Sequence, residues 1–202
     1  MKKRRINILD KKLEYAVLTL KVVVAAVGLG MFIGHFMAPA QLPKVWSYIA
    51  TMGVVIIPDL FRLMKVEISR KLELMYLIFL IPSLILGIDF DWYRLYPIFD
   101  KLAHLASGVL TVFAADELLE SVYKPLGGKD WRFKLLFMMA LAALIAVAWE
   151  CFEFLHDQLL GGQMQQLIVP GLADTMWDMI WALGGGLVTG VILLVYTSTL
   201  DK

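Results

Sequence analysis

The chain has 202 residues, of which 60% are hydrophobic and 18% are charged, and its mean hydropathy is +0.74. In an ordinary soluble domain the apolar share is nearer half and the charged share is about a quarter. This composition therefore excludes an ordinary soluble domain and predicts a protein of the lipid bilayer. The net charge of +1 indicates no nucleic-acid partner, and the single Cys151 excludes an intrachain disulfide.

The first predicted helix follows the basic start MKKRRINILDKK and covers residues 13–37. Its apolar run is longer than the roughly 7 to 15 residues of a signal-peptide core and meets the roughly 20 that span a bilayer, so we expect a retained transmembrane helix. Five further runs of spanning length follow, at residues 45–64, 72–88, 102–119, 133–155 and 176–196. The predicted fold is therefore all-α, a polytopic transmembrane bundle of six helices that forms one integral membrane domain over residues 1–202.

The basic residues predict the orientation of these helices. Of 19 lysines and arginines, 15 lie at the two termini and in the loops 62–73 and 123–134, and the opposite loops hold Lys44, Arg94 and Lys101. The positive-inside rule therefore predicts cytoplasmic N- and C-termini in a multi-pass protein of the bacterial cytoplasmic (inner) membrane. The acidic loops then face outward, and the long loop 157–173 is expected either to cover the outer surface as a lid or to lie on the bilayer.

Three of the predicted helices carry a pair of ionisable residues near their outward ends. Helical spacing places both members of each pair on one face, and a rise of about 1.5 Å per residue brings one member of each pair to a common depth of about 6 Å. An ionised acid buried alone in the membrane costs about 3 kcal/mol, so water, shared protons or a cation must offset the charge. The pairs are Asp100 with His104, Glu150 with Glu153, and Asp174 with Asp178.

The most specific hypothesis is that this layer binds a divalent cation. Carboxylates suit Mg²⁺, Mn²⁺ or Ca²⁺, and an added imidazole opens the choice to Zn²⁺ or iron. The alternative interpretation is a shallow water-filled vestibule in which Asp100 and Asp174 act as helix N-caps, although capping does not explain the deeper Glu150 and Asp178. The predicted metal ligands are Asp100, His104, Glu150, Asp174 and Asp178.

On the other half of the membrane, Lys21 is expected to form a structural ion pair. Its candidate partners are Glu117 and Asp59, because lone intramembrane charges are costly.

The same residues carry a resemblance to known families. The sequence Asp100-Lys101-x-x-His104 resembles the motif that opens one helix in the VanZ-like group of small bacterial membrane proteins, and the length and the WExxE sequence resemble the related YjdF-type family of uncharacterised inner-membrane proteins. Further matches are Glu153, the glutamine-rich loop, Pro170-Gly171, Asp174, Asp178 and Gly185, whereas Leu172 and Ala182 replace an arginine and an asparagine of the VanZ-like pattern. The resemblance implies an envelope-related role, with an envelope lipid or a glycopeptide-related ligand as partner.

Three functions are consistent with these observations. The first is a membrane protein of the envelope whose outward-facing acidic and histidine site binds a cation or stabilises the helix packing. The second is a metal-dependent enzyme acting on an envelope or lipid-linked substrate at the outer leaflet, with Glu153 as general base. The third is an ion-coupled transporter, which the apolar middle of the chain disfavours. The ligand and the oligomeric state stay open.

Overall fold

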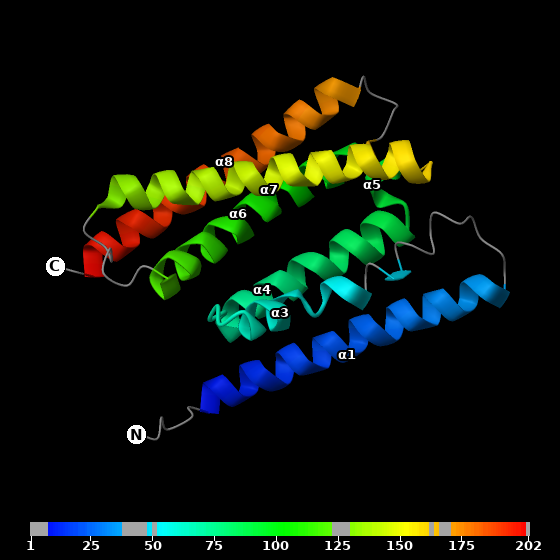
Figure 1. Ribbon diagram of the computed structural model, residues 1–202, viewed down its shortest axis with the longest axis horizontal. Helices are drawn as coiled ribbons and strands as arrows, with labels where there is room; N and C mark the ends of the chain where they lie inside the picture. The colour runs from blue at the N-terminus through cyan, green and yellow to red at the C-terminus, as the bar shows by residue number, and fades with distance from the viewer. Residues whose placement is uncertain are drawn as a thin grey trace. The chain divides into compact units, whose positions relative to one another are not determined.

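The computed structural model describes residues 8–37, 48–49, 52–122, 130–161, 164–165 and 171–200. These residues are almost entirely helical, and no strand occurs among them. In chain order the elements are α1 (Ile8–Met37), α3 (Ile57–Leu63), α4 (Arg70–Ile81), the π-helix η1 (Pro82–Asp89), α5 (Trp92–Leu95), α6 (Pro97–Val122), α7 (Trp131–Leu160) and α8 (Gly171–Leu200), shown in Figure 1.

Five helical segments of the described chain are long and apolar enough to cross a membrane, which confirms an all-helical, multi-pass membrane protein. They are Asp10–Gly34, Arg70–Ile88, Pro97–Ser121, Trp131–Leu159 and Gly171–Thr197. The predicted span 45–64 is not among them: a turn at residues 55–56 precedes the short α3, and residues 45–47, 50 and 51 lie outside the described part. The count of six spans and the cytoplasmic termini stay predictions.

The chain forms two compact units, Met1–Leu84 and Ile85–Lys202. In the first unit α1 packs against α4. Lys21 Nζ lies 2.5 Å from Asp59 Oδ2 and 2.5 Å from Oε1 of the fully buried Glu73. Arg62 and Arg70 also pair with Glu73, at 2.5 Å and 2.6 Å. The predicted ion pair of Lys21 is thus present with Asp59, and Glu73 is a further partner that the sequence pattern did not indicate.

The local sequence sets several helix boundaries. Ser69 caps α4 by accepting a hydrogen bond from Leu72 N at 3.1 Å, and Asp130 caps α7 by accepting from two backbone amides. Helix α7 ends at Gly161, whose φ of 67° is the left-handed conformation that glycine adopts without strain. At Pro82, which lacks a backbone N–H, the α-helical register of α4 changes to the π register of η1.

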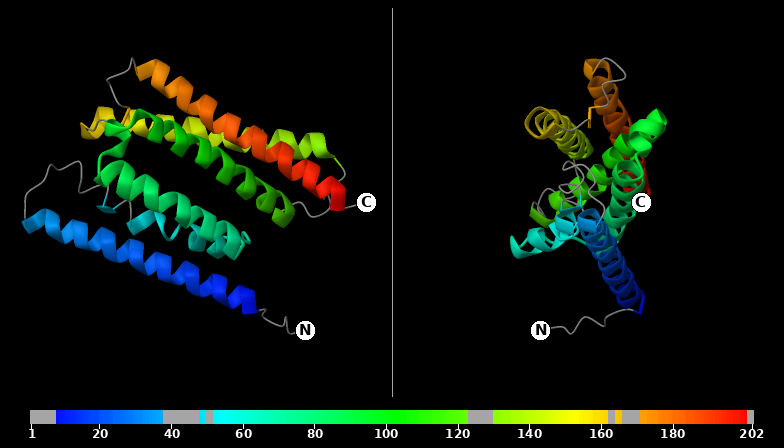
Figure 2. Two further views of the ribbon diagram at one scale, coloured as in Figure 1. Left: turned by 180° about the vertical axis from the view of Figure 1, so that it is seen from behind. Right: turned by 90° about the vertical axis from the view of Figure 1, so that its right-hand side faces the viewer.

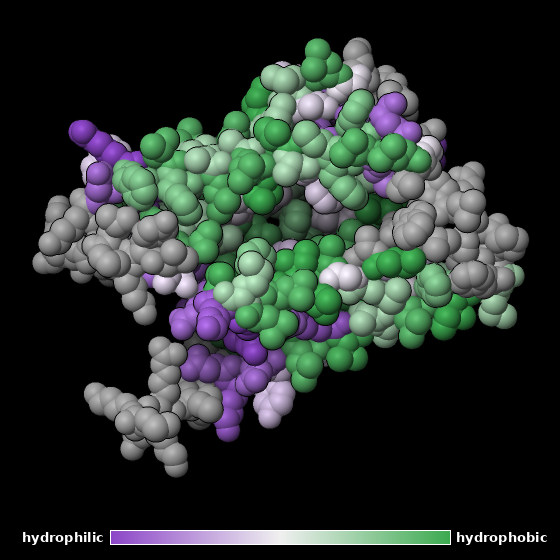
Figure 3. All heavy atoms as spheres, in the orientation of Figure 1, coloured by the Kyte–Doolittle hydropathy of each residue, from purple (hydrophilic) through white to green (hydrophobic). Residues whose placement is uncertain are grey.

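The second unit is built from three long helices that lie side by side. Helix α6 packs against both α7 and α8, and α7 packs against α8, as Figures 1 and 2 show. Its core contains the buried Val112, Ala115 and Met138. Many large apolar side chains point outward, and in Figure 3 hydrophobic side chains cover most of the visible described surface along the helices, as expected for contact with lipid.

Candidate functional site

Helices α6 and α8 approach each other closely because both carry glycine where they meet. A Cβ atom on Gly108 would overlap the carbonyl oxygen of Ala182, and one on Gly185 would overlap the carbonyl oxygen of Leu105. Small residues allow such backbone contact between membrane helices. The contact holds the adjoining first turns of α6 and α8, which carry the acidic residues, within side-chain reach of each other.

Lys101 lies among three of these acidic side chains. Its Nζ donates hydrogen bonds to Asp174 Oδ1 at 2.5 Å, to Asp178 Oδ1 at 2.7 Å and to Asp100 Oδ2 at 3.2 Å. An ammonium group has three N–H donors, so these contacts use all of them. The sequence pattern predicts Lys101 in an outer loop, but α6 begins at Pro97 and includes it. Its position inside the Asp100–His104 motif was the signal that pointed to the site.

His104 of α6 also lies beside a carboxylate of the third helix, α7. Its Nε2 lies 3.6 Å from Asp100 Oδ1, 3.7 Å from Glu150 Oε1 and 3.8 Å from Asp178 Oδ1. These three carboxylates come from α6, α7 and α8, and all four side chains are buried. The three residues expected at a common depth, His104, Glu150 and Asp178, therefore do converge.

The capping interpretation of Asp100 and Asp174 is wrong. Helix α6 begins at Pro97 and α8 at Gly171, so both aspartates lie within the first helical turn and their carboxylates turn to the ammonium of Lys101. The structural reason is that each helix starts several residues before the apolar run that marked it in the sequence. Negative charge in the first turn is still favourable, since the helix dipole is positive there.

Glu150 contributes a buried oxygen without a hydrogen-bond partner. Its Oε1 is one of three such side-chain atoms in the described part of the chain, and the side chain is only 6% exposed. A carboxylate oxygen in this state is costly, because burial removes the water that would otherwise solvate it. His104 Nε2 lies 3.7 Å from this oxygen, beyond hydrogen-bond distance.

The remaining acidic and histidine residues of α7 have other contacts. Glu153 is buried, and its Oε1 accepts a hydrogen bond from Trp149 Nε1 at 2.7 Å. Asp157 accepts hydrogen bonds from the backbone amides of Met164 and Gln165 at 2.8 Å and 2.9 Å, and so fixes the turn that follows α7. Residues 162–163 and 166–170 of the predicted lid lie outside the described residues.

Three residues of the cluster could hold a metal ion, by ligand type and spacing. Asp100, His104 and Asp178 each offer one ligand atom, and these atoms all lie within 4.8 Å of one another. In a tetrahedral site with bonds of about 2.0–2.2 Å, neighbouring ligand atoms are about 3.3–3.6 Å apart. The distances of 3.6–3.8 Å from His104 Nε2 to the three carboxylate oxygens are close to that spacing. Asp174, a predicted ligand, turns to Lys101 instead.

The sequence matches the family described as Predicted membrane protein (DUF2238) over residues 18–199, and the chain belongs to that family. This match supports a membrane-protein family and does not support the VanZ-like or YjdF-type assignment. No curated protein and no solved structure matches the chain.

Proposed function

We propose that this member of the DUF2238 family is a cation-binding protein of the bacterial inner membrane, with Asp100, His104, Glu150 and Asp178 around the ion. The observation that carries the proposal is the position of His104 Nε2, 3.6–3.8 Å from carboxylate oxygens of three helices, one of which, Glu150 Oε1, has no hydrogen-bond partner among the described residues. Mg²⁺, Mn²⁺, Ca²⁺ and Zn²⁺ all bind such oxygen and nitrogen ligands.

The charge balance supports a cation. Four carboxyl groups, those of Asp100, Glu150, Asp174 and Asp178, lie near Lys101 or His104, and the ammonium of Lys101 neutralises one negative charge. Three negative charges remain if all four acids are ionised. Because the isolated charges would repel each other in a site of low dielectric constant, an added divalent ion lowers the free energy of the folded protein.

The position of Lys101 also supports a second role for the cluster, one without a metal ion. An ion bound beside His104 would share Asp178 Oδ1 with the ammonium of Lys101, which lies 2.7 Å from it. In the metal-free case Lys101 and shared protons balance the carboxylates, and the cluster serves to hold α6 against α8. The two roles predict opposite effects of removing one negative charge.

An enzyme of the outer leaflet is less well supported. It assigns the role of general base to Glu153, which must then reach a water on the metal. The hydrogen bond from Trp149 on the same helix engages this carboxylate instead. Binding is therefore favoured over catalysis, and the positive-inside pattern supports an outward-facing site.

Asp178→Asn tests the proposal. If a divalent ion binds the cluster, the variant loses a charged ligand, its metal content falls, and its thermal unfolding temperature in the presence of metal drops, because an ion that binds only the folded state stabilises it by mass action. If the carboxylates merely repel one another, the same change leaves stability unchanged or raises it.

The measurement is thermal unfolding of the purified full chain with and without EDTA, beside metal analysis of the same samples. Glu120→Gln is the matched control, since it removes one negative charge from a side chain of α6 that is 69% exposed. A variant at least as stable as the parent, with no effect of EDTA on either, contradicts the cation-binding proposal.

A further inference from the structure

Lys101 holds two of the carboxylates that the proposed cation site needs. Its Nζ lies 3.2 Å from Asp100 Oδ2 and 2.7 Å from Asp178 Oδ1, the same oxygen that lies 3.8 Å from His104 Nε2. Glu150 Oε1, on the other side of the imidazole contacts, is buried, lies 3.7 Å from His104 Nε2 and has no hydrogen-bond partner among the described residues. Lys101 therefore binds only part of the cluster, and one oxygen is common to the lysine and the proposed ion.

The ammonium and a divalent ion come close together if both keep that oxygen. A metal–oxygen bond is about 2.0–2.2 Å long, so an ion on Asp178 Oδ1 lies at most about 5 Å from the ammonium nitrogen of Lys101. Two positive charges at this separation in a site of low dielectric constant repel each other strongly. Binding of the ion therefore favours departure of the ammonium from Asp178.

The side chain of Lys101 is the part of the site that has freedom to move. Helices α6 and α8 are in backbone contact just beyond the cluster, where a Cβ atom on Gly185 would overlap the carbonyl oxygen of Leu105. The lysine, in contrast, has a flexible four-carbon side chain. Its nearest carboxylate oxygen is Asp174 Oδ1 at 2.5 Å, which is not one of the proposed ligands. The ammonium is therefore free to release Asp178 and keep Asp174.

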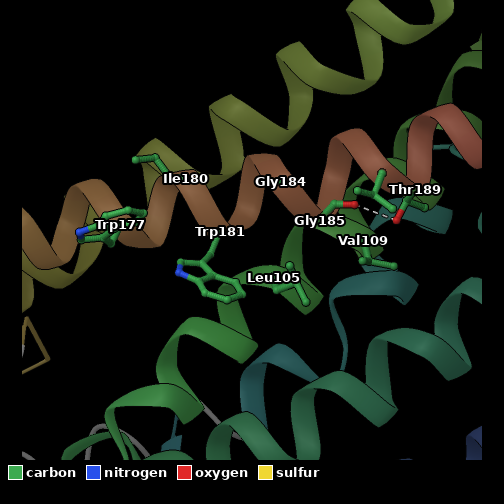
Figure 4. A pocket seen from close by; sticks show the side chains of 9 residues that line it. Leu105, Val109, Trp177, Ile180, Trp181, Gly184, Gly185 and Thr189 are labelled. Carbon is green, nitrogen blue, oxygen red and sulfur yellow. Dashed lines mark hydrogen bonds between the residues drawn. The ribbon is translucent and has the colours of Figure 1, made fainter.

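The groove beside this helix crossing offers the ammonium no other partner. Figure 4 shows Leu105 of α6 and Trp181 and Gly184 of α8 along it. No residue that lines the groove carries a charge, and Thr189 contributes its only hydroxyl group. An ammonium placed there without a carboxylate is unfavourable, so Asp174 remains its partner.

We propose that Lys101 is a built-in competitor of the cation: in the metal-free form its ammonium binds Asp100 and Asp178, and a divalent ion displaces it toward Asp174. The inference rests on the proposed function, because it assigns the regulation of that same site. Lys101 then sets the concentration of free metal that is needed to fill the site. The alternative is a fixed lysine that only orients the two aspartates for the ion.

The metal affinity of Lys101→Met distinguishes these two roles. The purified full-length parent and variant are dialysed against increasing Mn²⁺ and, in separate samples, Zn²⁺, and the bound metal is measured. Competition predicts that the variant binds metal about tenfold more tightly or better, because the competing charge and its repulsion are gone. A lysine that only orients the aspartates predicts weaker binding. Equal or weaker binding by the variant overturns the proposal.

Arg94→Met is the matched control, because it removes one positive charge from a side chain that is 59% exposed and pairs with Asp91. Its metal affinity is expected to equal that of the parent. Lys101→Gln also removes the charge, keeps a polar side chain and serves as a second variant should Lys101→Met fold poorly. A gain in Arg94→Met as large as that in the Lys101 variants shows a general effect of charge and overturns the proposal.

Asp174→Asn tests the position of the displaced ammonium. Without the Asp174 carboxylate, Lys101 loses the partner that it keeps when metal binds, so metal affinity is expected to fall several-fold in the parent. In the Lys101→Met background the same change is expected to have a smaller effect. An equal fall in the two backgrounds contradicts displacement toward Asp174.

The same samples separate this inference from the proposed function. Metal bound equally by the parent and by both Lys101 variants contradicts the competition alone. No metal in any of the proteins contradicts the proposed function and the competition with it. Metal in the Lys101 variants but not in the parent supports the competition and contradicts cation binding by the parent.

Discussion

Lys101 is the residue on which the electrostatics of the site depend. Its side chain is 17% exposed, and it holds three carboxylates that belong to two helices. A buried ion pair need not stabilise a protein more than apolar residues would, but removal of one partner leaves an uncompensated charge and costs about 3–5 kcal/mol. The cost of losing Lys101 is therefore expected to exceed that of losing any one of its partners.

Lys101→Met is expected to lower the thermal unfolding temperature strongly, since it keeps the hydrocarbon part of the side chain and removes the charge. The measurement is thermal unfolding in detergent, with Lys71→Met, an exposed lysine on α4, as control. In EDTA, where no metal is bound, addition of Asp178→Asn to Lys101→Met is expected to recover part of the loss, because it removes one of the repelling charges. A Lys101→Met protein as stable as the control variant would show that the ammonium is not needed.

At the scale of the elements, the contact between α6 and α8 positions the site. Gly108 and Gly185 face backbone atoms of the opposite helix, whereas Gly30 and Gly34 of α1 have nothing within 4 Å of their Cβ positions. A glycine in the sequence does not by itself indicate whether it packs against another helix or has open space beside it. In the first unit, ion pairs join the helices: Glu73 of α4 pairs with Lys21 of α1 and with Arg62 of α3.

Gly185→Ala is expected to destabilise the protein by about 1–3 kcal/mol, the usual cost of overpacking, because its methyl group meets the backbone of Leu105. Gly184→Ala is the control, with the same change one residue away and open space around it. Chemical or thermal unfolding of the two variants measures the difference. Equal unfolding curves would contradict the close contact of α6 and α8.

At the scale of the whole molecule, the distribution of basic residues predicts that both termini are cytoplasmic. A C-terminal fusion to a reporter that is active only in the cytoplasm is expected to be active, and a fusion to one that is active only outside is expected to be silent. The opposite pattern would reverse the predicted orientation and place the acidic site on the cytoplasmic side. Both fusions are compared at equal expression.

An introduced cysteine checks the same orientation independently. Gln165→Cys, placed in a background in which the native Cys151 is replaced by serine, is expected to react from outside with an impermeant thiol reagent. Gln165 lies in the turn after α7, where Asp157 accepts a hydrogen bond from its backbone amide. Labelling only after the membrane is opened would contradict the predicted orientation.

The sequence by itself determined the helical membrane fold and three of the residues that meet. Apolar runs of about 20 residues specify membrane helices almost alone, because a backbone in lipid must satisfy its hydrogen bonds internally. Same-face spacing and a common depth identified His104, Glu150 and Asp178 as neighbours, and their side chains converge at 3.7–3.8 Å. Helical periodicity alone indicates which residues share a face and a depth, whatever the packing of the helices.

Only the tertiary structure decided how the charges are paired. Lys101 belongs to α6 and reaches Asp174 and Asp178 of α8, a pairing set by the approach of the two helices at Gly108 and Gly185. The same approach leaves the groove beside Gly184, which local spacing does not encode. Contacts between helices depend on their crossing and separation, and one-dimensional periodicity fixes neither of these quantities.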